Sequence, residues 1–276
     1  MNVSNGTERE RIDVACACRR DYLPHTATML ASLLANAGGP VRVHHLSGPD
    51  LPDTEVEALT RFVAADGGEL IPHRVDESRL EDFGTTSTLP LAHWYRTLLP
   101  VLLPELSRVI YLDSDLLVLG PLTELWKLDL AGNALAAVTN RFPDPASGAE
   151  YCAALGVDPD AYFNSGVMVL DLDAMREADS FERIREFARR LGGRLILPEQ
   201  DAMCAVLGDR RLPLEERWNA MVGADPAGGG GTPVIRHFEG SRNKPWLDDA
   251  PIEDRLLWDS YRARTPWTGG EAVARG

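Results

Sequence analysis

Short apolar runs alternate with segments of helical periodicity along residues 1–72, and this alternation limits the folds open to the chain. Runs at residues 12–18, 41–46 and 69–72 are apolar enough for buried strands, whereas residues 23–37 and 52–65 space their apolar side chains as helices do. Glycine-containing stops follow both helical segments. Strands that alternate with helices build a mixed, mostly parallel sheet with helices on both faces. The sequence therefore predicts an α/β fold of the doubly wound, Rossmann-like type.

The rest of the chain continues this pattern less regularly. Further strands are expected at residues 108–119, 134–139, 162–172 and 233–238, and further helices at residues 91–103, 180–191 and 199–207. Residues 74–90 are polar and aperiodic, and a loop of this length in a compact domain is usually functional, so we expect a flap over a binding site. The glycine run at residues 228–231 is expected to be a mobile surface loop.

The charge and cysteine content exclude several classes of protein. The chain of 276 residues has a formal net charge of −14, which disfavours nucleic acid and anionic membrane surfaces as partners. A phosphate-bearing substrate would then need a metal ion or a local cationic cluster. The four cysteines form no CxxC pair and are expected to be buried structural thiols. No apolar run is long enough to span a bilayer and the N-terminus is polar, so we expect a cytoplasmic protein without a membrane anchor.

Two carboxylates interrupt the most apolar strand. Asp113 and Asp115 are two residues apart, so on an extended backbone both side chains leave the same face and converge on one hard cation. An acidic chain also produces this spacing by chance, at residues 158–160 and 171–173. The first of these reads as a turn, and in the second Asp173 reads as a helix cap. Four apolar residues flank the Asp113 and Asp115 pair on each side, and burying two like charges without a cation is costly.

A histidine at the end of the last predicted strand completes a possible metal site. His237 closes an apolar run, and a neutral imidazole there is a suitable third ligand. A lone histidine beside a strand is more often simply hydrogen-bonded. Here Gly240 and Lys244 follow, which are a glycine that permits close backbone approach and a lysine that can meet a phosphate group.

Taken together, these segments resemble the retaining glycosyltransferases of family 8. The resemblance runs from about residue 12 to residue 246, and its parts occur in the family's order: Asp21-Tyr22, a helix bearing Arg96, Tyr111-Leu-Asp113-Ser114-Asp115, Tyr162-Phe-Asn164-Ser165-Gly166, Glu199-Gln200-Asp201, His237-Phe-Glu-Gly240 and Lys244-Pro-Trp246. It implies the nucleotide-diphospho-sugar transferase fold of GT-A type. On this basis we expect a flexible tail at residues 1–10, one catalytic domain at 11–250 and a C-terminal helical tail at 251–276. The catalytic domain would divide into a nucleotide-binding half, 11–120, and an acceptor and sugar half, 121–250.

The resemblance also implies roles for individual residues. The expected ligands of Mn²⁺ or Mg²⁺ are Asp113, Asp115 and His237. The expected donor-binding residues are Asp21, Tyr22, Arg96, Ser114, Ser165, Gly240 and Lys244. The expected catalytic residues are Gln200, Asp201 and Asn164. Gln200 matches the residue beneath the anomeric carbon in this family, and Asp201 and Arg96 match binders of donor sugar hydroxyls.

The implied activity is metal-dependent transfer of a hexose, with retention, from a nucleotide diphosphate sugar to an acceptor. UDP is the default nucleotide, but Arg19-Arg20 stands where relatives usually carry a uracil-reading aspartate, and Asn140 replaces an aspartate that faces the sugar. The base, the sugar, the acceptor and the oligomeric state therefore stay open. A basic amphipathic tail is missing, which favours a soluble acceptor. The alternatives are a degenerate sugar-nucleotide-binding protein and a sugar nucleotidyltransferase, although the latter needs a glycine-rich loop after the first strand, where residues 17–20 contain no glycine.

Overall fold

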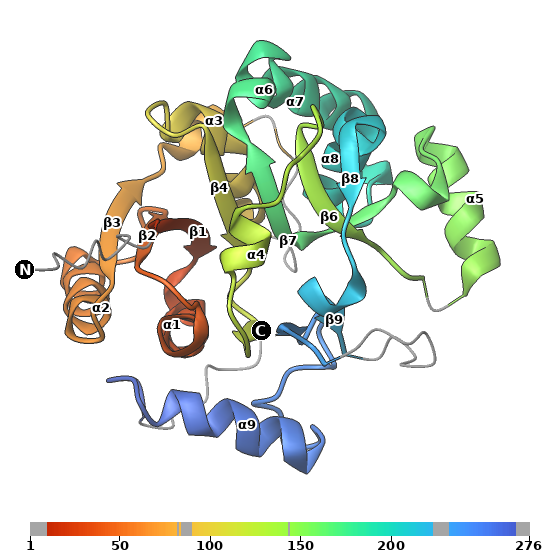
Figure 1. The fold of residues 1–276 in the computed structure, drawn as a ribbon. Helices are drawn as coiled ribbons and strands as arrows, with labels where there is room; N and C mark the ends of the chain where they lie inside the picture. Colours follow the sequence, from red (N-terminus) through yellow and green to blue (C-terminus); the bar gives the residue numbers. More distant parts are fainter. Residues whose placement is uncertain (1–9, 82, 84–89, 143, 223–231, 269–276) are drawn as a thin grey trace, which may run out of the picture.

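A seven-stranded sheet forms the centre of the molecule in a computed structural model that describes residues 10–81, 83, 90–142, 144–222 and 232–268. Its strand order is β3-β2-β1-β4-β7-β6-β8 (Figure 1). The strands are β1 (Ile12–Cys18), β2 (Val41–Ser47), β3 (Glu69–Arg74), β4 (Arg108–Leu112), β6 (Leu135–Thr139), β7 (Phe163–Asp171) and β8 (Arg211–Pro213). All neighbours pair in parallel except that β7 runs antiparallel to both β4 and β6. The predicted mixed, mostly parallel sheet is confirmed.

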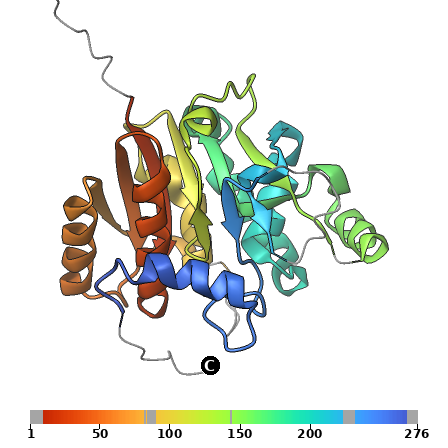
Figure 2. The same ribbon diagram turned by 60° about the horizontal axis from the view of Figure 1, so that its bottom comes forward.

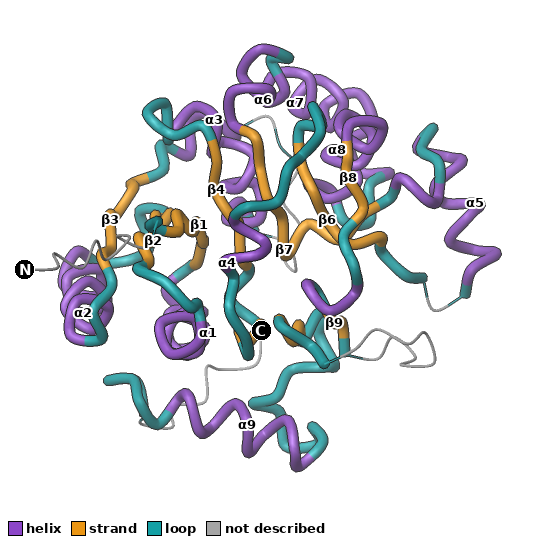
Figure 3. The backbone as a smooth tube through the Cα atoms, in the orientation of Figure 1, coloured by secondary structure: helices purple, strands orange, loops and turns teal. Residues whose placement is uncertain are grey.

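Helices cover both faces of this sheet, as predicted (Figure 3). Helices α1 (Leu23–Asn36), α2 (Asp53–Ala65) and α4 (Thr123–Trp126) contribute to one apolar core, and α3 (Leu99–Leu102), α6 (Leu172–Glu177), α7 (Ser180–Leu191) and α8 (Pro198–Leu207) contribute to the other. The strands supply both cores by alternation: in β4, Ile110 and Leu112 enter the first core, whereas Val109 and Tyr111 enter the second. The two-sided burial explains why the strands read as continuous apolar runs.

The predicted strand at residues 108–119 is wrong in one respect, because two strands occupy it. β4 ends at Leu112, and β5 (Leu116–Val118) belongs to a second sheet of order β5-β10-β9, with β10 (Ile235–His237) and β9 (Ala220–Met221). The backbone changes partners between them: Asp113 N donates to Gly166 O at 2.8 Å, and Phe238 N donates to Asp115 O at 2.9 Å. Asp113 and Asp115 therefore lie in the bend that joins two sheets, not on one face of an extended strand.

Other predictions differ from the structure in smaller ways. Residues Leu91–Leu98 form a 3-10 helix that runs into the short α3, where one longer helix was expected. Helix α5 (Pro145–Leu155) was not predicted. Asp171 caps α6 by accepting from Ala174 N, so the assignment of Asp173 as the cap is wrong. Of the expected flap, 74–90, residues 82 and 84–89 lie outside the described residues, as does the glycine run at 228–231, while Arg74 ends β3 and Glu77–Leu80 form a 3-10 helix. All four cysteines are buried and unpaired, as expected.

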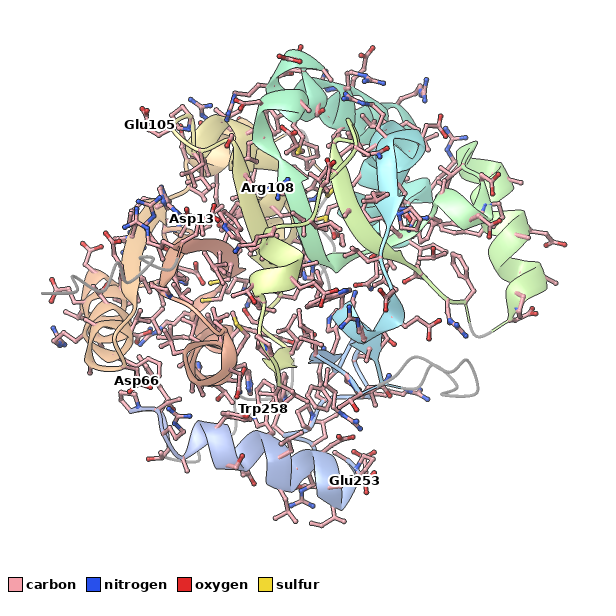
Figure 4. All side chains as sticks on the ribbon, in the orientation of Figure 1. Asp13, Asp66, Glu105, Arg108, Glu253 and Trp258 are labelled. Carbon is pink, nitrogen blue, oxygen red and sulfur yellow. The ribbon has the colours of Figure 1, made fainter. Side chains whose placement is uncertain are left out.

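The second sheet is held against the body by the last described helix. Helix α9 (Ile252–Arg262) passes beneath α1 and the second sheet (Figures 1 and 2). Its Trp258 is fully buried and packs edge-on against Phe238, the residue after β10 (Figure 4). Arg236 on β10 forms an ion pair with Asp254 on α9 at 2.6 Å. Helix α9 thus fixes the strand that ends in His237. Among the described helices, none has the length and apolar content needed to cross a bilayer.

Candidate active site

Asp113, Asp115 and His237 meet where the two sheets join. One possible ligand atom of each lies within 4.8 Å of the others, close to the spacing that an ion about 2.1 Å from every ligand allows. Asp113 follows β4 and Asp115 precedes β5, while His237 is the last residue of β10 and pairs with Leu116 of β5. The predicted triad is therefore brought together by the antiparallel pairing of β5 with β10.

A glycine on β7 makes this close approach possible. A Cβ atom on Gly166 would lie 2.3 Å from His237 Cε1 and 2.8 Å from Asp113 Oδ2, distances that non-bonded carbon and oxygen atoms do not adopt. Any side chain at this position would push the imidazole and the carboxylate apart. Gly166 thus has a steric role in the site, in addition to its backbone hydrogen bond with Asp113.

Arg96 and Tyr111 hold Asp113 mainly by Oδ1, and Arg96 Nη1 makes a longer contact of 3.4 Å with Oδ2. Arg96 Nη2 donates to Asp113 Oδ1 at 2.8 Å, and the Tyr111 hydroxyl donates to the same oxygen at 3.0 Å. The other Arg96 nitrogen, Nη1, donates to the carbonyl and the hydroxyl oxygen of Ser165, both at 2.9 Å. Arg96 is almost completely buried, so it fixes the carboxylate while Oδ2 stays directed toward the histidine and Gly166.

A chain of hydrogen bonds from Asn164 through Asn219 determines which nitrogen of His237 carries a proton. Gly166 N and Asn219 Nδ2 both donate to Asn164 Oδ1, at 3.0 and 2.8 Å, so the carbonyl oxygen of Asn219 must face His237 Nδ1, which it does at 2.9 Å. Nδ1 therefore holds the proton of the neutral imidazole, and Nε2 has a lone pair. That lone pair faces Asp115 Oδ1 at 3.2 Å. Two acceptors at this distance need either a second proton or a metal ion between them, so this donor set fits a divalent ion.

Lys244 lies on the other side of Asp115. Its Nζ forms a hydrogen-bonded ion pair with Asp115 Oδ2 and donates to the Phe238 carbonyl at 2.8 Å. Burial alone would raise the pKa of Asp115, but the nearby His237 and Lys244 hold it well below its usual range, so the carboxylate stays ionised. Gly240 begins the turn that returns the chain to Lys244, and its φ of +74° lies in the region that favours glycine.

The N-terminal turn of α8 faces the same cluster with two side chains. Glu199 Oε1 accepts from the Ser165 hydroxyl at 2.8 Å and lies 3.5 Å from Arg96 Nη1. Gln200 Oε1 accepts from Ser165 N at 3.0 Å. Both side chains are buried. Ser165 therefore connects the helix to the arginine that holds Asp113, and the predicted Gln200, Ser165 and Arg96 belong to one continuous network.

Asp201 points away from this network. It is fully buried, with Oδ1 accepting from the Tyr162 hydroxyl at 2.6 Å. Oδ2 accepts from the Tyr151 hydroxyl at 2.5 Å and from the backbone N–H groups of Ile196 and Leu197, both at 2.9 Å. Three of these bonds go to Oδ2 and one to Oδ1, and both oxygens are buried within the protein. The expected contact between Asp201 and sugar hydroxyls stays a prediction.

Three residues of the cluster were given no role by the sequence analysis. Glu199 precedes Gln200 in the matched motif, and this position alone could have indicated that it shares the first turn of the helix. Gly166 was part of a motif, but its steric contacts depend on β10, which is distant in sequence. Asn219 follows a short 3-10 helix and belongs to no motif, so nothing local in the sequence indicates its bond to His237.

Comparison with known proteins decides the family. Residues 13–250 match the description "Glycosyl transferase family 8". The chain belongs to this family. Family membership makes it a glycosyltransferase, which uses a nucleotide-sugar donor and an acceptor. It is 30% identical over 275 residues to General stress protein A of Bacillus subtilis (strain 168), covering 92% of this chain and 93% of that protein. It is 28% identical over 277 residues to a probable galacturonosyltransferase-like 7 of Arabidopsis thaliana, covering 91% and 75% of the two chains.

Solved structures of glycosyltransferases share the fold. The galactosyltransferase LgtC, crystallised with donor and acceptor sugar analogues, superposes with a TM-score of 0.81 at 21% identity, covering 94% of this chain and 98% of that one. The glycosyltransferase GlyE of Streptococcus pneumoniae TIGR4 superposes with a TM-score of 0.70 at 22% identity, covering 91% of this chain and 60% of that one. At these identities the likeness establishes the GT-A type of fold, as the sequence predicted.

In this family 8 chain, the loop after β1 carries an ion pair next to an exposed ring. Arg19 donates to Asp21 Oδ2 at 3.1 Å. Tyr22 is 37% exposed and meets Trp246 edge-on at 6.1 Å between ring centroids. Burial, with the charges of Asp115 and Asp21, raises the pKa of Tyr22 to about 12. The ring is therefore a neutral, partly open stacking surface beside the acidic cluster.

The hydroxyl of Ser114, expected to bind the donor, is engaged in the protein. It lies 2.8 Å from the Thr26 hydroxyl on α1 and donates to Ala17 O on β1 at 3.1 Å. The side chain is buried. The Ser114 hydroxyl thus ties the bend between the two sheets to the first strand and helix, and a contact of Ser114 with the donor stays a prediction.

The charges of the cluster do not balance. Three carboxylates, Asp113, Asp115 and Glu199, face two cationic side chains, Arg96 and Lys244. A divalent ion would change this excess of one negative charge into an excess of one positive charge. The site would then attract a diphosphate, although the chain as a whole has a net charge of −14.

Proposed function

We propose that this protein transfers a hexose, with retention of anomeric configuration, from UDP-hexose to a soluble acceptor, and that it needs Mn²⁺ or Mg²⁺ to do so. The observation that carries the proposal is the geometry of His237. Its Nε2 faces Asp115 Oδ1 at 3.2 Å, and Asp113 completes a set of two carboxylates and one imidazole. This set suits a divalent ion that binds a diphosphate.

The residues around the triad have complementary roles in this proposal. Asp113, Asp115 and His237 hold the ion, which when bound neutralises charge on the diphosphate of the donor. Lys244 offers a second positive charge and can turn from Asp115 toward a phosphate oxygen. Tyr22 provides a stacking surface for the base. The ion pair of Arg19 with Asp21 lies in the same loop, where the base would be read.

The polar network at α8 would receive the sugar. Glu199, Ser165 and Arg96 are joined to one another by polar contacts. Asn164 precedes Ser165 in the chain, and its side chain accepts a hydrogen bond from Asn219. In this proposal Gln200 would lie beneath the reacting carbon. A carboxamide is a poor nucleophile, so we propose attack of the acceptor on the same face from which the phosphate leaves. The departing phosphate oxygen would then take the proton of the acceptor hydroxyl.

Donor turnover tests the proposal. The protein is incubated with UDP-glucose, UDP-galactose, GDP-mannose and dTDP-glucose, each with Mn²⁺ and with a chelator, and nucleotide release is measured. We expect metal-dependent release from at least one UDP-sugar and a loss of at least about 100-fold in Asp115→Asn. Asp173→Asn is the matched control, because Asp173 is an exposed aspartate that bonds Arg176 on α6, away from the site. Since all four donors carry an α-linked sugar, retention predicts an α-linked product by proton NMR, and a β-linked product would contradict it.

Two results would count against the proposal in different ways. If no nucleotide sugar is bound or hydrolysed with either metal ion, the assignment of the site is wrong. If UDP binds in a metal-dependent manner but no donor is turned over with any acceptor, the protein is a sugar-nucleotide-binding protein. The replacement of two expected aspartates by Arg19 and Asn140 is the observation that favours this second function.

A further inference from the structure

A directed chain of hydrogen bonds connects Asp201 to Gln200 through a tyrosine. Ser165 N donates to Gln200 Oε1 at 3.0 Å, and because a backbone N–H only donates, the atom facing it must be the carbonyl oxygen of the amide. Gln200 Nε2 then faces the Tyr162 hydroxyl at 3.2 Å. An amide nitrogen only donates, so the tyrosine oxygen accepts this hydrogen bond. The Tyr162 hydroxyl in turn donates a hydrogen bond to Asp201 Oδ1 at 2.6 Å.

The far end of the chain is rigid. Asp201 takes part in four hydrogen bonds, two of which come from the backbone immediately before α8, at Ile196 and Leu197. Tyr162 is fully buried, and its ring packs against Phe142 with centroids 5.2 Å apart. Neither the carboxylate nor the phenol can turn without breaking several contacts. The direction of every hydrogen bond in the chain is therefore fixed by its surroundings.

The near end of the chain reaches the metal-ligand triad. Ser165 N donates to the carbonyl oxygen of Gln200. The carbonyl and hydroxyl oxygens of Ser165 also accept hydrogen bonds from Arg96. Arg96 in turn holds Asp113. A half-turn of the Gln200 amide would place its NH₂ group against the Ser165 N–H and its oxygen against the Tyr162 hydroxyl. Two donors would then face each other within the network.

We propose that Tyr162 is a positioning residue that locks the side-chain amide of Gln200 in one of its two orientations, with Asp201 as the anchor of the lock. This inference rests on the proposed function, since it assigns the locked amide to the sugar-transfer step. It gives a role to an aspartate that is fully buried within the protein, because Asp201 would act on Gln200 through Tyr162. The fixed Gln200 amide would orient a sugar that is already bound. Loss of the lock should therefore lower turnover more than donor binding.

The substitution Tyr162→Phe tests the lock, with Tyr151→Phe as a matched control. Both remove a phenol oxygen that donates to the carboxylate of Asp201, at 2.6 and 2.5 Å, but only Tyr162 also contacts Gln200. We expect kcat to fall about three- to tenfold in Tyr162→Phe, the value of one lost hydrogen bond. The KM for the donor should change less than about twofold in this variant. Tyr151→Phe should keep kcat within about twofold.

A spectroscopic readout makes the test independent of turnover. The side-chain NH₂ resonances of Gln200, assigned by their loss in Gln200→Leu, are followed in ¹⁵N-labelled protein. We expect them to shift in Tyr162→Phe and to stay in place in Tyr151→Phe. In the Gln200→Leu background, Tyr162→Phe should lower kcat no further, since the two residues act as one unit.

The outcomes separate the two levels of the proposal. Equal effects of the two tyrosine variants on kcat and on the Gln200 resonances would overturn the lock and reduce both tyrosines to structural contacts. An inactive wild-type protein that binds no nucleotide would overturn the proposed function. In that case a selective shift of the Gln200 resonances in Tyr162→Phe would still establish the hydrogen-bond chain, without its catalytic meaning.

Discussion

Gly166 shows how a single residue limits the geometry of the site. The imidazole of His237 and the carboxylate of Asp113 occupy the space that a side chain at Gly166 would need. The motif that contains Gly166 could be recognised in the sequence, but the reason for a glycine there depends on β10, about 70 residues later. The same holds for Asn219, whose bond to His237 sets the tautomer and is invisible in any local pattern.

The first prediction follows from this crowding. Gly166→Ala should lower the affinity for Mn²⁺ and for UDP with Mn²⁺ at least about tenfold, because the new methyl group separates two ligands. Isothermal titration calorimetry measures both affinities. Gly193→Ala is the control, since a Cβ atom there would meet no atom within 4 Å. An unchanged affinity in Gly166→Ala, with the control also unchanged, would contradict the steric role.

A second residue-scale prediction concerns stability and pH. Burial, with smaller contributions from Arg74 and His73, lowers the pKa of His45 to about 4 from 6.5. Between these values the unfolded chain binds a proton that the folded protein does not, so the free energy of unfolding falls as the pH is lowered. The slope is about 1.4 kcal/mol per pH unit, or about 2 kcal/mol between pH 6.5 and 5.

Urea unfolding of wild type and of His45→Asn at pH 7 and at pH 5 checks this prediction. The wild type should lose about 2 kcal/mol more than the variant between the two pH values. The partly exposed His93 supplies the control, His93→Asn, which should behave as the wild type does. The same loss in wild type and in His45→Asn would show that this histidine is not the source of the pH dependence.

At the scale of elements, the sequence predicted best those helices and strands whose bounds are set by local patterns. The bounds of β1, α1, β2 and α2 agree with the predicted ranges to within about a residue, because each element has its own periodicity and its own stop. The break between β4 and β5 could not be predicted in this way. Its two halves are equally apolar, and only their partners, Gly166 on β7 and Phe238 after β10, assign them to different sheets.

Helix α9 carries an element-scale prediction. Trp258 is fully buried between α9 and the second sheet, so Trp258→Ala should lower the free energy of unfolding by about 3 to 5 kcal/mol. Since β10 ends in His237, a proposed ligand of the ion, Mn²⁺ affinity should fall as well. Leu256→Ala, which removes a side chain that is 63% exposed on the same helix, should change neither quantity appreciably. Urea unfolding and calorimetry measure the two effects. If the free energy of unfolding falls by the expected amount while the metal affinity is unchanged, α9 does not hold β10 in place.

At the scale of the whole molecule, the site lies at the junction of two sheets. The larger sheet supplies Asp113 through β4 and Gly166 through β7, and the smaller sheet supplies Asp115 and His237 through β5 and β10. A change of sheet within three residues is therefore what places two carboxylates around one point. The net charge of −14 gives the proposed ion a further role, because the molecule as a whole repels an anionic donor.

The central claim is that side chains from both sheets bind one divalent ion. Anomalous diffraction at the manganese absorption edge, from crystals soaked with Mn²⁺ and UDP, tests it most directly. We predict a single strong peak about 2.1 to 2.3 Å from a carboxylate oxygen of Asp113, a carboxylate oxygen of Asp115 and Nε2 of His237. No peak at this position, or a peak that contacts the aspartates while His237 stays bound to Asp115, would contradict the account.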